Sequence, residues 1–141
     1  MKKIERKDEK RMKETLPKSI QKLILSLREK LKDEPEIVDM FERCYSNTLD
    51  TTVKKMEDGS TYVITGDIPA MWLRDSVAQL RPYLVPAQND PELADLIAGL
   101  IRRQFMCINI DPYANAFNEG PNGNCWETVS YTHLRAHETD S

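Results

Sequence analysis

One short stretch, residues 65–76 (TGDIPAMWLRDS), constrains the fold more than any other part of this sequence. Gly66 and Pro69 interrupt any regular element, so the chain must turn there. Two aspartates, an arginine and a tryptophan then stand among small and apolar residues, and burying such charges is costly unless they are paired or hydrogen-bonded. The stretch therefore predicts either a structural ion pair at a turn or a polar binding site.

The residue types at the end of this stretch suit a sugar ring. Arg74 offers a fork of donors beside the two acceptor oxygens of Asp75, which is the combination that adjacent hydroxyl groups require. Trp72 offers an apolar face for the ring carbons. The alternative is a structural Arg–Asp pair at the start of a helix, and the residue types alone do not separate the two.

Apolar residues spaced three and four apart predict helices on both sides of the stretch. The first covers residues 19–31. The second begins at Pro35, because proline fits the first turn of a helix. The third begins near Asp75 or Ser76, either of which can cap it, and runs toward Tyr83. The predicted inner face of the second helix consists of Ile37, Met40, Phe41, Cys44 and Tyr45.

A fourth helix opens at Asp90, which can cap it, and Pro91, which suits its first turn. Arg102 and Arg103 are expected on its solvated face. The predicted buried stripe consists of Leu93, Leu96, Ile97, Leu100, Ile101, Phe105 and Ile108. The small residues expected to admit a close neighbour are Ala94, Ala98 and Gly99.

Residues 61–65 (TYVIT) form the only β-like run, and the turn residues before it predict a short hairpin arm. Residues 47–56 and 111–126 are expected to be loops. The second loop mixes aromatic rings with planar polar groups, which is typical of carbohydrate pockets and also occurs in structured surface loops. The members of this mixture are Tyr113, Asn115, Phe117, Asn118, Glu119 and Trp126.

Charge and cysteine content exclude several classes of function. The chain has 20 basic and 23 acidic residues, a net charge of −3, and so no basic bias toward nucleic acid. Its three cysteines lack CxxC spacing and are expected to be reduced thiols. The longest apolar run, residues 23–25, is too short to cross a membrane, and the charged N-terminus has no apolar signal region. We expect a cytoplasmic protein; its oligomeric state stays open.

Three blocks in the sequence together resemble glycoside hydrolase family 125. They are residues 47–52 (NTLDTT), residues 65–76, and residues 111–119 (DPYANAFNE), in the family's order. The resemblance covers residues 17–127. The family consists of bacterial and fungal exo-acting α-mannosidases, so the resemblance implies an enzyme that hydrolyses terminal α-1,6-linked mannose with inversion, acting on mannose-containing oligosaccharides without a metal or other cofactor.

The resemblance also implies a fold and a site. The fold is all-α: the N-terminal part of an (α/α)6 barrel, incomplete in this chain, with a short β-hairpin arm. Asp50 is implied to lie close behind the site. The implied substrate-binding residues are Asp67, Trp72, Arg74, Asp75, Asn115, Asn118 and Glu119.

Inverting hydrolysis needs a carboxylic acid to protonate the leaving oxygen and a carboxylate to activate water. By the family pattern both groups lie in later parts of the barrel, so we expect no catalytic acid or base in this chain and no activity from it alone. The carboxylates thereby set aside are Asp50, Asp67, Asp75, Asp111, Glu119 and Glu127. Two alternatives remain: another (α/α)6 glycosidase family in which Asp67 and Asp75 are the acid–base pair, and a non-catalytic helical interaction module.

The predicted domain organisation has three parts. Residues 1–16 form a charged extension, residues 17–128 belong to the glycosidase domain, and residues 129–141 resemble the translation of a sequencing adapter. The last part contains His133 and His137, whose i, i+4 spacing could imitate a metal site on a helix. No third ligand stands near them, so we expect no metal site there.

Overall fold

The computed structural model describes residues 16–66 and 68–121, together with the backbone of residues 133–135. This part of the chain is mainly helical, with two small antiparallel sheets. In chain order the elements are α2 (Lys18–Lys30), α3 (Pro35–Thr51), β1 (Val53–Lys55), β2 (Thr61–Val63), β3 (Met71–Trp72), α4 (Leu73–Leu80), the 3-10 turn η1 (Arg81–Tyr83), α5 (Leu84–Ala87), α6 (Pro91–Ile110), β4 (Ala114–Phe117) and β5 (His133–Arg135).

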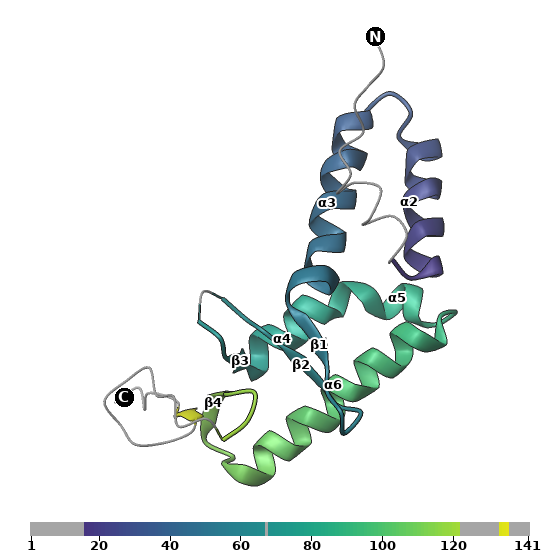
Figure 1. Ribbon diagram of the computed structural model, residues 1–141. Coiled ribbons are helices and arrows are strands. Elements are labelled where there is room, and N and C mark those ends of the chain that lie inside the picture. The colour runs from purple at the N-terminus through teal and green to yellow at the C-terminus, as the bar shows by residue number, and fades with distance from the viewer. Residues whose placement is uncertain (1–15, 67, 122–132, 136–141) are drawn as a thin grey trace.

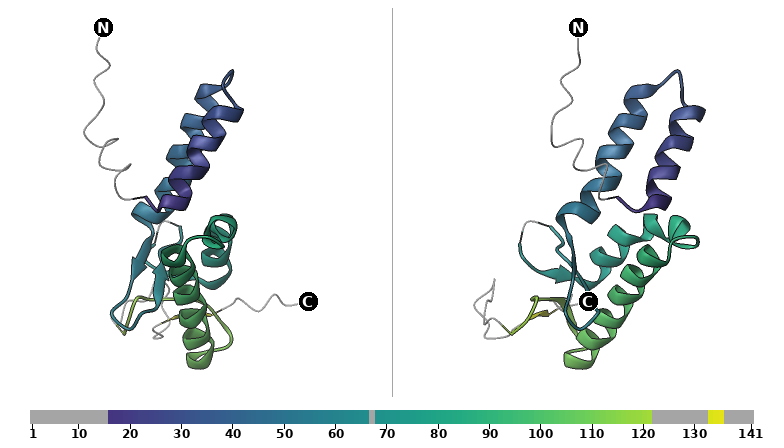
Figure 2. Two further views of the ribbon diagram at one scale, coloured as in Figure 1. Left: turned by 90° about the vertical axis from the view of Figure 1, so that its right-hand side faces the viewer. Right: turned by 45° about the vertical axis from the view of Figure 1, so that its right-hand side comes forward.

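The elements divide into a helical pair and a mixed layer. Helices α2 and α3 lie side by side as an antiparallel pair at one end, and α6 runs across the other (Figure 1). The β1–β2 hairpin packs on α6, and the same arrangement is visible from two further directions (Figure 2). Strands β3 and β4 lie at the end of the described part that is far from the α2–α3 pair.

One hydrophobic core joins these elements. It contains Leu16, Ile20, Ile24, Tyr62, Val63, Met71, Leu80, Tyr83, Leu93, Leu100, Cys107, Ala114 and Phe117. Because its members come from both helical regions and from strands β2, β3 and β4, burial of this apolar surface fixes the site-bearing strands to the helices.

Asp90 connects the starts of two helices. One carboxylate oxygen accepts a hydrogen bond from the backbone N–H of Leu93 at 3.2 Å, which confirms Asp90 as the cap of α6. The other accepts from the hydroxyl of Ser19 at 2.6 Å and from its backbone N–H at 3.3 Å, in the first turn of α2. A single buried carboxylate therefore serves the N-termini of α2 and α6.

Helix α6 and strand β2 approach each other closely at Gly99. A Cβ atom at this position would lie 2.4 Å from the Thr61 hydroxyl oxygen, so the expected role of Gly99 in admitting a close neighbour is confirmed. The same hydroxyl donates to the carbonyl of Leu96 at 2.8 Å. The contact thus fixes the position of α6 along the strand.

Two sequence-based element predictions were wrong. Residues 47–51, expected in a loop, continue α3: the backbone N–H of Thr52 still donates to the Thr48 carbonyl at 3.1 Å, and the hydroxyls of Thr51 and Thr52 also donate to carbonyls one turn earlier. Residues 61–65 were expected to be the only β-like run, but β2 pairs with β1, which lies in the loop predicted at residues 47–56, and strands β3, β4 and β5 form a second sheet. The predicted hairpin arm itself is confirmed, with Val53 opposite Val63.

Helix faces also differ from the predicted stripes. On α6, Ile101, Phe105 and Ile108 are exposed, whereas Arg103, expected in solvent, is buried. On α3 the buried apolar residue is Val38, while Ile37, Met40 and Cys44 are exposed. Among the described helices none is long and apolar enough to span a membrane.

Candidate functional site

Thr65 closes the loop that leads into the candidate site. Its backbone N–H donates to the carbonyl of Ala70 at 3.0 Å, and its buried hydroxyl accepts from the backbone N–H of Trp72 at 2.8 Å. Gly66 has a φ of 77°, a left-handed conformation that glycine adopts without strain. The turn predicted from Gly66 and Pro69 is therefore confirmed; Asp67 lies outside the described residues.

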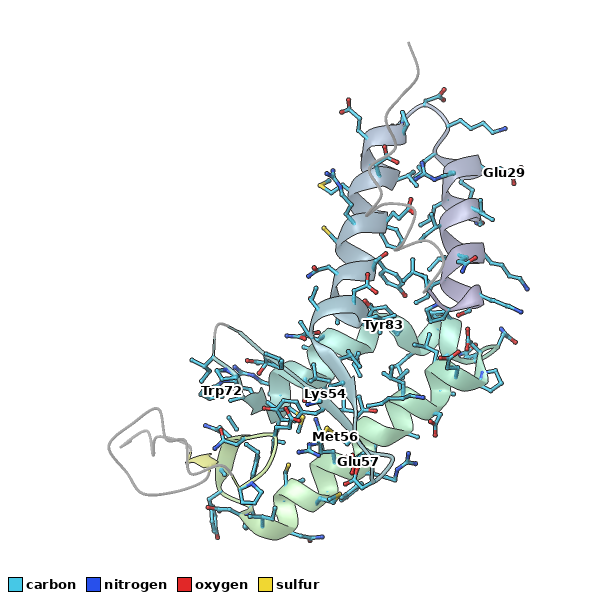
Figure 3. The ribbon with its side chains drawn as sticks, viewed as in Figure 1. Glu29, Lys54, Met56, Glu57, Trp72 and Tyr83 are labelled. Atoms are coloured by element: carbon cyan, nitrogen blue, oxygen red, sulfur yellow. The ribbon has the colours of Figure 1, made fainter. Side chains whose placement is uncertain are left out.

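Strands β3 and β4 bring two of the sequence blocks together. They pair antiparallel, with Met71 opposite Phe117 and Trp72 opposite Ala116. Figure 3 shows Trp72, the last residue of β3, far from Glu29 of α2. Strand β4 lies within residues 111–119. The Trp72–Asp75 segment and the Asn115–Glu119 segment therefore both begin in the same small sheet. The expectation of a loop throughout residues 111–126 was wrong for the described part, since β4 gives it this partner.

Arg74 and Asp75 lie in the first turn of α4, not before it. The helix begins at Leu73, so Asp75 is not its N-cap, although a carboxylate in the first turn complements the helix dipole. The Nε of Arg74 lies 3.4 Å from a carboxylate oxygen of Asp75, with their side chains 95% and 46% exposed. The sequence-based assumption that these charges are buried was therefore wrong here. Most of the guanidinium donors face solvent and are available to a ligand.

The downstream segment presents a mixed polar surface. Asn115 is exposed, whereas Asn118 and Glu119 are half-buried. The Glu119 carboxylate forms an ion pair with Lys54 of β1, which ties this segment to the hairpin arm. Asp111, at the start of the segment, is buried and accepts a hydrogen bond from the backbone N–H of Tyr113 at 2.9 Å.

Tyr62, a buried residue of β2, links the two segments of the candidate site. Burial raises the pKa of its hydroxyl to about 12, so the group stays protonated at neutral pH. The hydroxyl lies 3.3 Å from the carbonyl oxygens of both Pro69 and Phe117 and shares its proton between them. Pro69 precedes β3 and Phe117 ends β4, so one phenol links both sides.

Arg103 was missed by the sequence reasoning. Its guanidinium donates to the Ser60 hydroxyl at 3.1 Å and to the backbone carbonyl of Glu119, and lies 4.9 Å from the centre of the Tyr62 ring. A signal was present: Arg103 follows Gly99 by four positions and therefore lies on the same face of α6, against the strands.

The remaining predictions concern Asp50 and the expected absence of a metal site; the side chains of His133 and His137 lie outside the described residues. Asp50, on α3, lies near the Tyr83 hydroxyl, and burial of part of its carboxyl raises its pKa. Within the described residues, no group of three histidine, cysteine, aspartate or glutamate side chains could hold a metal ion.

The arrangement combines an exposed arginine, a carboxylate, a tryptophan and asparagine side chains around one strand pair, which suits a polyhydroxylated ligand. The protein family that the chain resembles also acts on a polyhydroxylated ligand. Residues 34–140 match the family model described as metal-independent α-mannosidase (GH125), which is a family of glycoside hydrolases. The chain belongs to this family. The match includes residues 129–140, so the boundary expected at residue 128 stays a prediction.

Two relatives show how much of a family member the chain represents. The Meiotically up-regulated gene 157 protein of Schizosaccharomyces pombe is 46% identical over 104 residues, covering 71% of this chain and 20% of the relative. A solved Streptococcus pneumoniae metal-independent α-mannosidase, in a non-productive complex with α-1,6-mannobiose, is 56% identical with a TM-score of 0.72. That match covers 75% of this chain and 25% of the solved chain. The chain therefore spans about a quarter or less of these relatives.

Proposed function

We propose that this chain contributes mannose-binding residues to an exo-acting, inverting α-mannosidase that hydrolyses terminal α-1,6-linked mannose. The observation that carries the proposal is the β3–β4 pairing, which places Trp72 opposite Ala116 and so unites two sequence blocks that resemble the family. The α-1,6-mannobiose complex of the Streptococcus pneumoniae relative supports this choice of sugar and linkage.

In the proposed site, Arg74 and Asp75 hold hydroxyl groups of the terminal mannose. The 3.4 Å contact between them is long for a charged hydrogen bond, and the arginine is 95% exposed, so a sugar can take up its donors without first breaking a strong ion pair. Trp72, half-buried at the end of β3, supplies an apolar surface. Asp67, Asn115, Asn118 and Glu119 complete the proposed site.

We propose that the catalytic acid and base are not among the carboxylates of this segment. In the described residues Glu119 is engaged by Lys54 and Asp111 by the Tyr113 amide, roles that hold loops in place. The proposed scaffold is an (α/α)6 barrel, of which the helices described here form the first part. Their apolar faces and the site-bearing strands between them are consistent with that architecture.

Sugar binding by the chain itself tests the proposal. We expect titration with α-1,6-mannobiose to shift the amide NMR signals of residues 71–76 and 114–119. Arg74→Ala should weaken binding about ten- to a hundredfold, because it removes a charged hydrogen bond worth about 1.5–3 kcal/mol. Arg81→Ala, an exposed arginine at the far end of α4, is the matched control and should leave the affinity unchanged. Shifts confined to other regions, or equal binding by both variants, would contradict the proposal.

A further inference from the structure

Two consecutive residues of α6, Arg103 and Gln104, each hold one side of the candidate site. Successive residues of a helix point about 100° apart, so neighbours in sequence can contact different elements. Arg103 contacts the segment that follows β4, through the carbonyl of Glu119. Gln104 contacts the start of α4, where its side-chain amide donates to the Leu73 carbonyl at 2.9 Å and to the Ser76 hydroxyl at 3.0 Å.

The contact made by Gln104 fixes the helix turn that carries the proposed sugar-binding pair. Leu73 and Ser76 flank Arg74 and Asp75 on both sides, and the Ser76 hydroxyl also donates to the Leu73 carbonyl at 2.8 Å. Ser76 is completely buried. The first turn of α4 is therefore anchored on its buried side, while its opposite side leaves Arg74 exposed.

Arg103 is a buried charged residue whose hydrogen bonds go to the hairpin and to the segment that follows β4. The residue is only 8% exposed, and within the described residues its Nε has no hydrogen-bond partner. A buried guanidinium with an unused donor is stabilised less than a fully paired one. Its remaining donors nevertheless hold Ser60 of the hairpin and the Glu119 carbonyl together.

Helix α6 can support both site segments because its own position in the fold is fixed. Gly99, one turn before Arg103, lies against Thr61 of β2 with no room for a methyl group, and Asp90 caps the start of the helix. A displacement of either site segment relative to α6 must therefore break the hydrogen bonds of Arg103 or Gln104.

We infer that Arg103 and Gln104 are positioning residues that set the spacing between the Arg74–Asp75 turn and the Asn115–Glu119 segment for sugar binding. The inference rests on the proposed function, because the spacing matters only if both segments contact the same sugar. Neither residue needs to touch the ligand.

The experiment compares Gln104→Met and Arg103→Met with Arg102→Met in the 141-residue chain. Methionine keeps an unbranched side chain without the donors, and Arg102, the exposed neighbour, holds the hairpin turn through the Gly59 carbonyl and not the site. Hydrogen exchange without sugar is measured for residues 71–76 and 114–119. We expect about tenfold faster exchange at residues 71–76 in Gln104→Met and at residues 114–119 in Arg103→Met, and no change in the control.

Affinity for α-1,6-mannobiose, measured on the folded fraction, separates positioning from general stability. We expect about tenfold weaker binding in Gln104→Met and Arg103→Met, and partial recovery in Arg103→Lys, which restores a donor. Unchanged affinity with faster exchange would overturn the positioning role and leave the proposed function intact. Absence of binding in the unaltered chain would overturn the proposed function and the inference with it, whatever the exchange rates.

Discussion

Replacing Asp90 should destabilise the fold more than replacing any ordinary surface carboxylate. Asp90→Ala removes the cap of α6, worth about 1 kcal/mol, and leaves the Ser19 donors in α2 without their charged acceptor, worth about 1.5–3 kcal/mol. Since the two losses share one carboxylate and do not add fully, the free energy of unfolding should fall by about 2–4 kcal/mol. A small domain has a total of about 5–15 kcal/mol.

The pH dependence of the free energy of unfolding separates the contribution of the Asp90 charge from that of its capping oxygen. The hydrogen bond from the Ser19 hydroxyl is the main cause that lowers the pKa of Asp90 in the folded chain. Because the folded pKa lies below the unfolded value of about 3.9, the charged carboxylate stabilises the fold fully above that value, and this contribution is lost as the pH falls through the folded pKa. Asp90→Asn retains a capping oxygen but not the charge.

Urea unfolding followed by circular dichroism, at two low protein concentrations, provides the test. At neutral pH the order of stability should be unaltered chain, Asp90→Asn, Asp90→Ala, and the gap between the first two should close below about pH 4. Asp95→Ala is the control in the same helix, because Asp95 makes only exposed ion pairs and should change stability by less than about 0.5 kcal/mol. Equal effects of Asp90→Ala and Asp95→Ala, or a gap that does not depend on pH, would refute the reasoning.

Three further predictions concern packing, self-association and independence from metal ions. Gly99→Ala should lower the free energy of unfolding by about 1–3 kcal/mol, because its Cβ would lie 2.4 Å from the Thr61 hydroxyl oxygen. Ala98→Ser is the neighbouring control in the same urea assay. An unchanged midpoint for Gly99→Ala would contradict the close contact. Phe105→Lys should reduce self-association in sedimentation velocity, because Phe105 is 65% exposed beside other exposed apolar residues of α6; an identical distribution of species would show that this face does not drive association. A full-length family member carrying residues 34–121 of this chain should hydrolyse α-1,6-mannobiose equally well in EDTA, and activity that requires added calcium would place the site chemistry in another class.

Features set by local chemistry were predicted correctly from the sequence. Proline at Pro35 and the Asp90–Pro91 pair define helix starts within one turn, so α3 and α6 begin where expected. The turn at residues 56–60 also depends on nearby residues, and the hairpin forms around it. The family was identified for a related reason: its blocks are contiguous runs of sequence.

Features that depend on distant partners were not predicted. Strand β3 has two residues, too few for an alternating pattern, and it exists because β4 pairs with it from more than 40 positions away. Arg103 was assigned to solvent from its charge, although Gly99 marks that side of α6 as the face against β2. Arg74 shows the opposite error, since its apolar neighbours suggested burial and the helix turns it outward.

The structure of a full-length family member that carries residues 34–121 of this chain, bound to α-1,6-mannobiose, tests the central claim most directly. We predict that the Arg74 guanidinium and the Asp75 carboxylate lie within about 3.2 Å of hydroxyl groups on the terminal mannose, with the Asn115–Glu119 segment on the other side of the same ring. A terminal mannose bound elsewhere, with the β3–β4 pair and the first turn of α4 making no contact with it, would contradict the account.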